Sequence, residues 1–325
     1  MTEALDLGVQ VTGHGTYNLR GGSLTAGTVN LDAGGTFNQT GGSLYATTFN
    51  QQGGTVTGSL ENRGTFNYSS GLFDGRLLNY GVVNFNTDFT AADGLANFSS
   101  TGLVVDPGRT VTLNGQGLDN QGKLVVNGIL TGSGPLLNDY SGLLSGSGLL
   151  AGNFINRGTV NPGDSIGTLN VTGSFTQTAT GNLLVQVGSP SSYDRISVTG
   201  LATLDGRLTP QLINGYRPQP NQIFTDVFTA TDGISGTFSY VGNFTPTLIG
   251  TALYTGNSID LLVQRDYTNA ELGLNSNQMA VGAIFNSLAD TASGDLGGVL
   301  NSLDNLPTVG AVQDAYKQVS PEKAG

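Results

Sequence analysis

The chain has 325 residues and a formal net charge of −11, and only 11% of its residues are charged, against roughly a quarter in an average domain. This acidic balance argues against a nucleic-acid partner, because phosphate binding needs a surface rich in Lys and Arg. The absence of cysteine excludes disulfides and cysteine-based metal or redox chemistry. Glycine accounts for 51 residues, and Asn, Thr and Ser carry most of the polarity, which is typical of strands and turns.

The first residues, from Met1 to Asp6, include neither a basic segment nor an apolar run, so they do not resemble a secretory signal. No segment approaches the roughly 18 apolar residues of a membrane-spanning helix. We therefore expect either a cytosolic protein or a piece of a longer secreted protein.

Residues 13 to 67 contain an internal repeat. The tetrapeptide Gly21-Gly22-Ser23-Leu24 recurs as Gly41-Gly42-Ser43-Leu44, at a spacing of twenty. A second pattern, Gly-Thr-x-Asn, surrounds these copies, and alternation along it points one apolar residue of each copy inward. The inward residues are Tyr17, Val29, Phe37, Phe66 and, in a looser copy, Val83. Strands this short at a period near twenty predict the coils of a parallel β-helix, with Gly and Asn in left-handed conformations at the corners.

The triplet Asn-x-Gly marks several of the predicted corners. It occurs at residues 62–64, 79–81, 120–122 and 156–158. Two interpretations stay open. The asparagines could form a ladder in which each amide binds the next one along the solenoid, or they could be ordinary turn residues in the left-handed conformation.

The pattern changes twice in the second half of the chain. Strands lengthen between Gly181 and Gln264, where half of the ten prolines lie, and we interpret this part as the end of the solenoid, closed by a hairpin-like cap. From Asn269 the apolar period becomes helical. Three apolar stripes are predicted, with N-caps at Ser293 and Thr308 for the second and third helices. The stripes are Met279, Ala283, Ile284 and Leu288; then Leu296, Val299, Leu300 and Leu303; then Val312, Tyr316 and Val319.

Residues from about Leu149 to Gly325 resemble the C-terminal half of an autotransporter passenger of type Va secretion. The motifs that carry the resemblance are residues 161–169 (NPGDSIGTL), 194–204 (DRISVTGLATL), 215–218 (GYRP), 277–281 (NQMAV) and 318–322 (QVSPE). In that family the last motif lies shortly before an outer-membrane β-barrel. The resemblance therefore implies a chain whose barrel is absent and whose helical tail, residues 275 to 320, packs weakly.

Two motifs imitate catalytic or cofactor-binding signatures. Gly163-Asp164-Ser165 matches the nucleophile block of some esterases, but a serine nucleophile needs a general base, and the only histidine, His14, lies far upstream. A tight turn between two strands explains the block better. The glycines of residues 146–151 imitate a dinucleotide fingerprint but precede a strand instead of a helix, so we discard that interpretation.

Carboxylates deserve separate consideration, because β-helices can host polysaccharide hydrolases and lyases. Asp88, Asp93, Asp106 and Asp119 could line one face, but they form no tight pair in the sequence. The Gly-Gly-x-Gly-x-Asp repeat of calcium-binding β-helices is missing. We therefore assign no catalytic, cofactor-binding or metal-ligating residue and expect no cofactor.

Together these observations predict an all-β, right-handed parallel β-helix with a β-rich C-terminal cap and a short α-helical tail. The predicted regions are 1–180, the β-helical repeats; 181–268, a cap resembling an autochaperone region; and 269–325, a helical linker toward the absent barrel. The expected function is a non-catalytic cell-surface passenger, an elongated module for adhesion or self-association, located outside the cell or on the bacterial outer membrane. Its expected partners are further copies, surface glycans or proteins, and its own barrel in the full-length chain. A surface-anchored polysaccharide-active enzyme and a structural filament subunit remain the alternatives.

Overall fold

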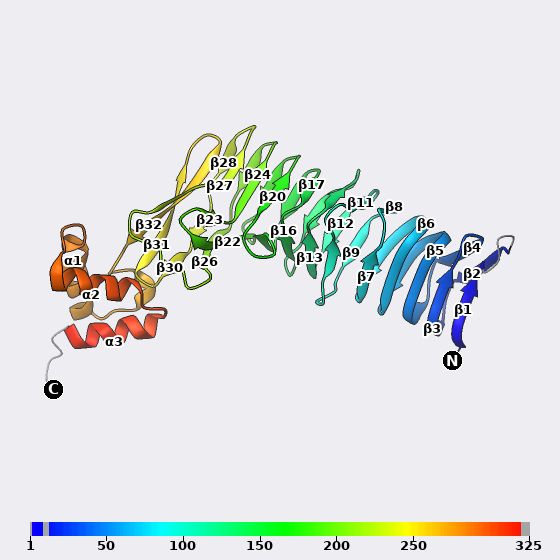
Figure 1. The fold of residues 1–325 in the computed structure, drawn as a ribbon, viewed down its shortest axis with the longest axis horizontal. Coiled ribbons are helices and arrows are strands. Elements are labelled where there is room, and N and C mark those ends of the chain that lie inside the picture. The colour runs from blue at the N-terminus through cyan, green and yellow to red at the C-terminus, as the bar shows by residue number, and fades with distance from the viewer. Residues whose placement is uncertain (1, 9–12, 320–325) are drawn as a thin grey trace.

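The protein is an elongated parallel β-solenoid with three α-helices packed together at its C-terminal end (Figure 1). The structure, a computed structural model, describes residues 2–8 and 13–319. The predicted fold class is confirmed in this part of the chain.

The N-terminal coils are built from the repeated tetrapeptide and the Gly-Thr-x-Asn copies. Parallel pairing places Val29 beside Phe49, Phe49 beside Phe66 and Phe66 beside Val83, so these inward residues share one column. Tyr17 and Phe37 pair in another column. The strands of this part are β1 (Thr2–Leu7), β2 (Gly15–Leu19), β3 (Ser23–Leu31), β4 (Gly35–Gln39), β5 (Ser43–Asn62), β6 (Thr65–Asn79) and β7 (Val82–Phe85).

Beyond β7 the strands have three or four residues each as far as residue 177, several later ones are longer, and the parallel strands form three stacks. The first stack contains β10 (Leu103–Val105), β13 (Lys123–Val126), β16 (Leu143–Gly146), β19 (Thr159–Pro162), β22 (Asn182–Ser189), β26 (Arg207–Leu212) and β29 (Tyr240–Val241). The second contains β8 (Phe89–Ala91), β11 (Thr110–Leu113), β14 (Ile129–Thr131), β17 (Leu149–Ala151), β20 (Thr168–Val171), β24 (Arg195–Val198) and β27 (Ile223–Ala230). The third contains β9 (Leu95–Asn97), β12 (Leu118–Asn120), β15 (Leu136–Asn138), β18 (Phe154–Asn156), β21 (Phe175–Gln177), β25 (Ala202–Leu204) and β28 (Ile234–Gly236).

A continuous apolar core runs inside the coils. Aromatic rings fill its N-terminal part, where Phe37, Phe49 and Phe66 follow one another with ring centroids 5.2 and 5.7 Å apart. Four of the five residues predicted to point inward are buried, and Tyr17 packs partly buried against the core. Because each coil contributes only a few core side chains, the core gains stability from neighbouring coils instead of from any single strand.

Parallel pairing continues well past residue 181 and ends with β29, after which the chain turns antiparallel. β31 (Leu248–Tyr254) and β32 (Ser258–Arg265) form a hairpin, and β32 also pairs antiparallel with β27. Two short strands, β23 (Ser192–Tyr193) and β30 (Asn243–Thr245), pair antiparallel with β22 and β31. A hairpin-like cap closes the solenoid as predicted, but parallel coils fill the predicted cap region from residue 181 to 241. The hairpin occupies the edge on which another coil would otherwise stack.

The tail contains η1 (Ala270–Leu272), α1 (Ser276–Leu288), α2 (Gly294–Asp304) and α3 (Val309–Val319). Ser293 holds the N-cap position of α2 as predicted, although its side chain makes no capping hydrogen bond, and the Thr308 hydroxyl caps α3 by accepting from the Ala311 amide at 3.2 Å. The stripe predicted for α1 is wrong, because Met279, Ile284 and Leu288 are exposed. The helix instead buries Gln278, Gly282 and Phe285.

The expectation that the tail packs weakly is also wrong. Tyr267, Phe285, Leu300, Val312 and Tyr316 form a second apolar core. A buried polar contact ties this core to the solenoid: Arg265 Nε donates to Asp304 Oδ2 at 2.8 Å, and the Tyr267 hydroxyl donates to Asp304 Oδ1 at 2.9 Å. The helices are therefore docked on the last strand of the hairpin.

Candidate functional site

A buried ladder of side-chain amides runs along the C-terminal ends of the third stack. Asn79 donates to Asn97 at 2.9 Å, Asn97 to Asn120 at 2.8 Å, and Asn120 to Asn138 at 2.7 Å. The ladder begins one coil earlier, at Asn62, and continues through Asn156 to Gln177. All of its members are buried. The ladder interpretation of the Asn-x-Gly corners is therefore confirmed, and Asn97 and Asn138 join it without that triplet.

Most ladder amides also donate to a backbone carbonyl at the next corner. Asn62 Nδ2 reaches Val82 O at 2.8 Å, and Asn138 Nδ2 reaches Thr159 O at 3.0 Å. Gln177 ends the ladder by donating to Asp205 O and Arg207 O, both at 2.9 Å. Because buried amides are costly unless they are hydrogen-bonded, these bonds stabilise the corners.

The glycine of each triplet serves close packing and not a left-handed turn. A Cβ at Gly81 would lie 2.0 Å from Gly64 O, and one at Gly158 would lie 2.3 Å from Gly142 O. The expectation of left-handed corners is therefore wrong for these triplets, but it is confirmed for the Gly-Gly-Ser-Leu copies, where Gly22 and Gly42 have φ of 70° and 75°. Among the described residues other than glycine, a positive φ occurs only at Asn214, Asn221 and Asp226, and the triplet glycines have none.

A second ladder lies on the outside of the N-terminal coils. Asn50 donates to Asn30 and Asn67 donates to Asn50, both at 2.8 Å, and Asn84 donates to Asn67 at 2.7 Å. Asn30 in turn donates to Asp6 Oδ1 at 2.7 Å. These asparagines come from the Gly-Thr-x-Asn copies and from the equivalent position in β5, and they place a row of amides on the surface.

The structure separates the residues of the esterase-like motif. Ser165 lies in an exposed turn between β19 and β20, in the middle part of the rod, whereas His14 lies several coils away, just before β2 near the N-terminal end (Figure 1). Gly163 has a φ of 85°, and Asp164 accepts a hydrogen bond from Asn127 Nδ2 at 2.7 Å. Residues 163–165 therefore form a turn, with no histidine from the described residues beside Ser165. Residues 146–151, the dinucleotide imitation, lead into β17, a strand, as expected.

Three of the four aspartates considered for catalysis sit at corners of the coils, and the fourth, Asp119, lies in β12. Asp88 accepts from the Thr110 amide at 2.8 Å, and Asp93 accepts from Gln116 at 2.9 Å. Asp119 accepts from Gln121 at 3.1 Å, and the Asp106 carbonyl accepts from the Arg109 amide at 3.0 Å. Over residues 2–8 and 13–319, no three His, Asp or Glu side chains gather in a way that could hold a metal ion.

A carboxyl group that sequence reasoning missed lies beneath the turn at 163–167. Asp194 is fully buried and accepts hydrogen bonds from the Gly167 amide at 2.9 Å and the Gln186 amide at 2.8 Å. Burial raises the pKa of Asp194 to about 7, although both amide hydrogen bonds act to lower it. Asp194 belongs to the 194–204 motif, yet its sequence neighbours give no sign that the turn covers it.

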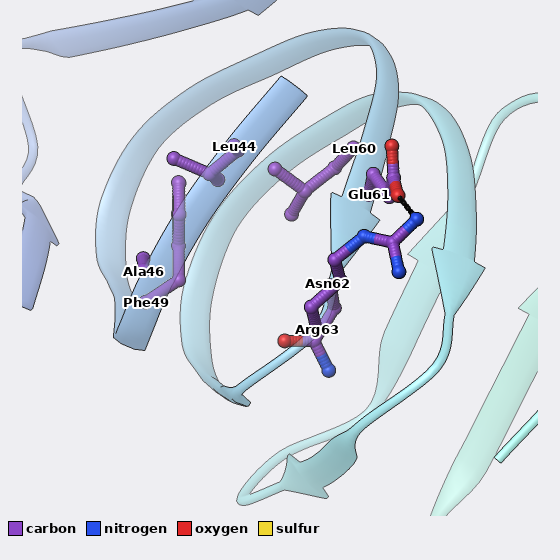
Figure 2. Close-up of a pocket in the computed structure, with 7 residues that line it drawn as sticks. All are labelled: Leu44, Ala46, Phe49, Leu60, Glu61, Asn62 and Arg63. Atoms are coloured by element: carbon purple, nitrogen blue, oxygen red, sulfur yellow. Dashed lines mark ion pairs between the residues drawn. The ribbon is translucent and has the colours of Figure 1, made fainter. Parts of the chain in front are cut away.

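A narrow gap between two coils, with a surface groove beside it, lies where the coil length changes. The ladder spacing is 20 residues from Asn30 to Asn50 but 17 from Asn50 to Asn67, because the shorter coil lacks a third copy of Gly-Gly-Ser-Leu. Ser43–Ala46 pair with Ser23–Ala26, whereas the pairing of β5 with β6 begins only at Thr48. Figure 2 shows the consequence: Leu44, Ala46 and Phe49 of one coil face Leu60 of the next across a gap too narrow for water.

The side chain of Arg63 stands at the outer edge of this gap, where it forms an ion pair with Glu61 (Figure 2). Its guanidinium also lies over the Tyr80 ring, 4.8 Å from the ring centroid. Beside it opens a groove of about 600 Å³, which we call the Arg63 groove. It is lined by Thr25, Ala26, Gly27, Tyr45, Ala46, Thr47, Arg63, Gly64 and Thr65.

The helical end carries a second hollow, an apolar one of about 630 Å³ between α2 and α3. Val299, Leu303 and Val319 are among the residues that line it. None of the helices in the described part of the chain combines the length and the apolar character needed to cross a membrane.

Comparison with protein-family models and with curated proteins finds no match for this chain.

Proposed function

We propose that this chain is a non-catalytic, elongated module of a bacterial cell surface, the passenger part of an autotransporter, and that it acts in adhesion or self-association. The observation that carries the proposal is the rod itself. Stacked coils repeat the same outward positions along its length, and an antiparallel hairpin with docked helices closes its C-terminal end. Repetition of one surface along a rod suits contact with an extended or multivalent partner.

The composition of the surface supports the same proposal. Amides and hydroxyls replace most charged side chains, as the outer asparagine ladder illustrates. Few charges mean little repulsion between rods at close range, so contact between copies is not opposed electrostatically. Association of this kind should weaken only mildly with added salt, because few ion pairs can take part.

The proposal can be tested by displaying residues 1–325 on an outer-membrane barrel in a bacterium that does not aggregate. Cells that display the rod should settle faster or bind an abiotic or glycan-coated surface better than cells that display the barrel alone. Analytical ultracentrifugation of the purified chain at increasing concentration and salt gives an independent measure of self-association. Equal settling and equal binding, together with a strictly monomeric profile, would contradict the proposal.

A further inference from the structure

The Arg63 groove combines an aromatic wall, a fixed hydrogen-bond donor and hydroxyl groups. Tyr45 is 50% exposed and lines the groove from the longer coil. In the described part of the chain Tyr45 makes no aromatic or cation–π contact, whereas Tyr80 is stacked on Phe98 with centroids 4.7 Å apart and is also covered by Arg63. One aromatic residue beside the groove therefore keeps its ring available.

Arg63 is held in place on two sides. Its ion pair with Glu61 and its position over Tyr80 restrict the guanidinium, while 48% of the side chain remains exposed. A guanidinium carries five N–H donors, so those not used by Glu61 can serve a ligand. The Glu61 carboxylate balances the charge of Arg63, and this pair therefore gives the groove no net attraction for an anion.

The floor of the groove does not admit another β-strand. A Cβ on Gly64 would lie only 2.3 Å from Ala46 O, so the two coils already touch at this corner. An extended peptide could not insert between them to add strand hydrogen bonds. Thr47 and Thr65 border the same corner and supply hydroxyl groups at the surface.

We propose that the Arg63 groove binds a neutral oligosaccharide. A pyranose ring presents an apolar C–H face that suits the exposed ring of Tyr45, and its hydroxyls suit the donors of Arg63 and the hydroxyls of Thr47 and Thr65. A purely apolar ligand would leave these polar groups unpaired, and an anionic ligand would meet the balanced pair of Arg63 and Glu61. This inference rests on the proposed adhesive function and names a ligand class for it.

The experiment titrates neutral hexasaccharides of glucose, mannose, galactose and N-acetylglucosamine, with hexagalacturonate as the anionic comparison, by calorimetry and saturation-transfer NMR. We expect at least one neutral hexasaccharide to bind the purified chain more tightly than hexagalacturonate. Tyr45→Ala should weaken that binding by roughly tenfold or more, and Tyr45→Phe should largely retain it, because the ring and not the hydroxyl makes the contact. The matched control is Tyr140→Ala, which removes a 67% exposed tyrosine elsewhere on the rod and should leave binding unchanged.

Three results would overturn the inference: no binding of any neutral hexasaccharide, equal losses in Tyr45→Ala and Tyr140→Ala, or preference for hexagalacturonate. Circular dichroism of each variant shows that it retains the wild-type fold. Cell display separates this inference from the proposed function. If displayed cells adhere or aggregate while the hexasaccharides do not bind, the groove inference fails and the adhesive function stands. If wild-type cells neither adhere nor aggregate, the proposed function fails whatever the groove binds.

Discussion

The amide of Asn120 donates to Asn138 Oδ1 at 2.7 Å, and both side chains are fully buried at the same corner of successive coils. Asn120 also accepts from Asn97, so each inner rung of the ladder is both donor and acceptor. Removing one rung therefore affects the coils on both sides of it. The ladder thus couples neighbouring coils through polar contacts that run parallel to the apolar core.

Asn120→Ala should lower the free energy of unfolding by about 2–6 kcal/mol. The substitution removes the acceptor of Asn97 and the donor to Asn138, and each buried group left unpaired costs about 1–3 kcal/mol. Urea denaturation followed by circular dichroism measures the change. The control is Asn84→Ala at the exposed end of the outer ladder, which should cost less than about 1 kcal/mol because water can replace its hydrogen bond. Equal costs at the two positions would show that burial of the inner ladder contributes nothing.

Arg265→Ala should undock the helices from the hairpin. The substitution leaves the Asp304 carboxylate buried without its cation, a change that typically costs about 3–5 kcal/mol. Hydrogen exchange should accelerate over residues 276–319 and stay unchanged in the parallel coils. Lys317→Ala serves as the control, because it removes an exposed ion pair within α3 and should change exchange very little. Uniform acceleration in the coils and the helices would indicate that the two parts unfold as one unit.

The sequence predicts the solenoid well because short motifs repeat at the period of its coils. The twenty-residue repeat of Gly-Gly-Ser-Leu and the Gly-Thr-x-Asn copies identify the inward residues, and the structure buries Val29, Phe37 and Phe66 completely. The buried ladder is visible through four triplets. Asn97 and Asn138 are not marked by the triplet. Ser99 stands where the glycine would follow Asn97, and a longer corner follows Asn138.

The sequence does not predict contacts that depend on distant parts of the chain. Helix α1 shows an apolar stripe through Met279 and Ile284, yet it buries the face of Gly282. The helix approaches Tyr267 so closely there that a Cβ on Gly282 would lie 2.4 Å from the Tyr267 carbonyl oxygen. The Arg63 groove likewise arises from a difference in length between two coils. The missing third copy of Gly-Gly-Ser-Leu marks the shorter coil in the sequence, but the side chains that line the groove come together only when the coils are stacked.

Gly163→Val should destabilise the protein, whereas Ser165→Ala should leave its stability within about 0.5 kcal/mol. Gly163 has a φ of 85°, and a Cβ there would lie 2.6 Å from Ser165 O. Backbone strain of this kind costs on the order of 1–3 kcal/mol before the clash is added. Thermal unfolding of both variants measures the difference, and hydrolysis of p-nitrophenyl acetate checks the esterase-like motif at the same time. Hydrolysis by the wild type that disappears in Ser165→Ala would contradict the interpretation of residues 163–165 as a turn.

Asp194 should make the free energy of unfolding depend on pH. Its pKa is raised to about 7 in the folded protein by burial, compared with about 3.9 in an unfolded chain. Between these values the folded protein holds a proton that the unfolded chain releases, and this favours folding. The contribution is fully present below about pH 4 and is lost as pH rises through 7.

Asp194→Asn cannot titrate, and its amide would set an N–H group against one of the two backbone amides, so it should be less stable than the wild type at pH 5. The difference in unfolding free energy between wild type and Asp194→Asn should shrink from pH 5 to pH 8, as measured by urea denaturation. The exposed Asp232 provides the control, since Asp232→Asn should keep a constant difference from the wild type over this range. A constant difference for Asp194→Asn as well would mean that the Asp194 carboxyl is ionised throughout, which would contradict the burial effect on its pKa.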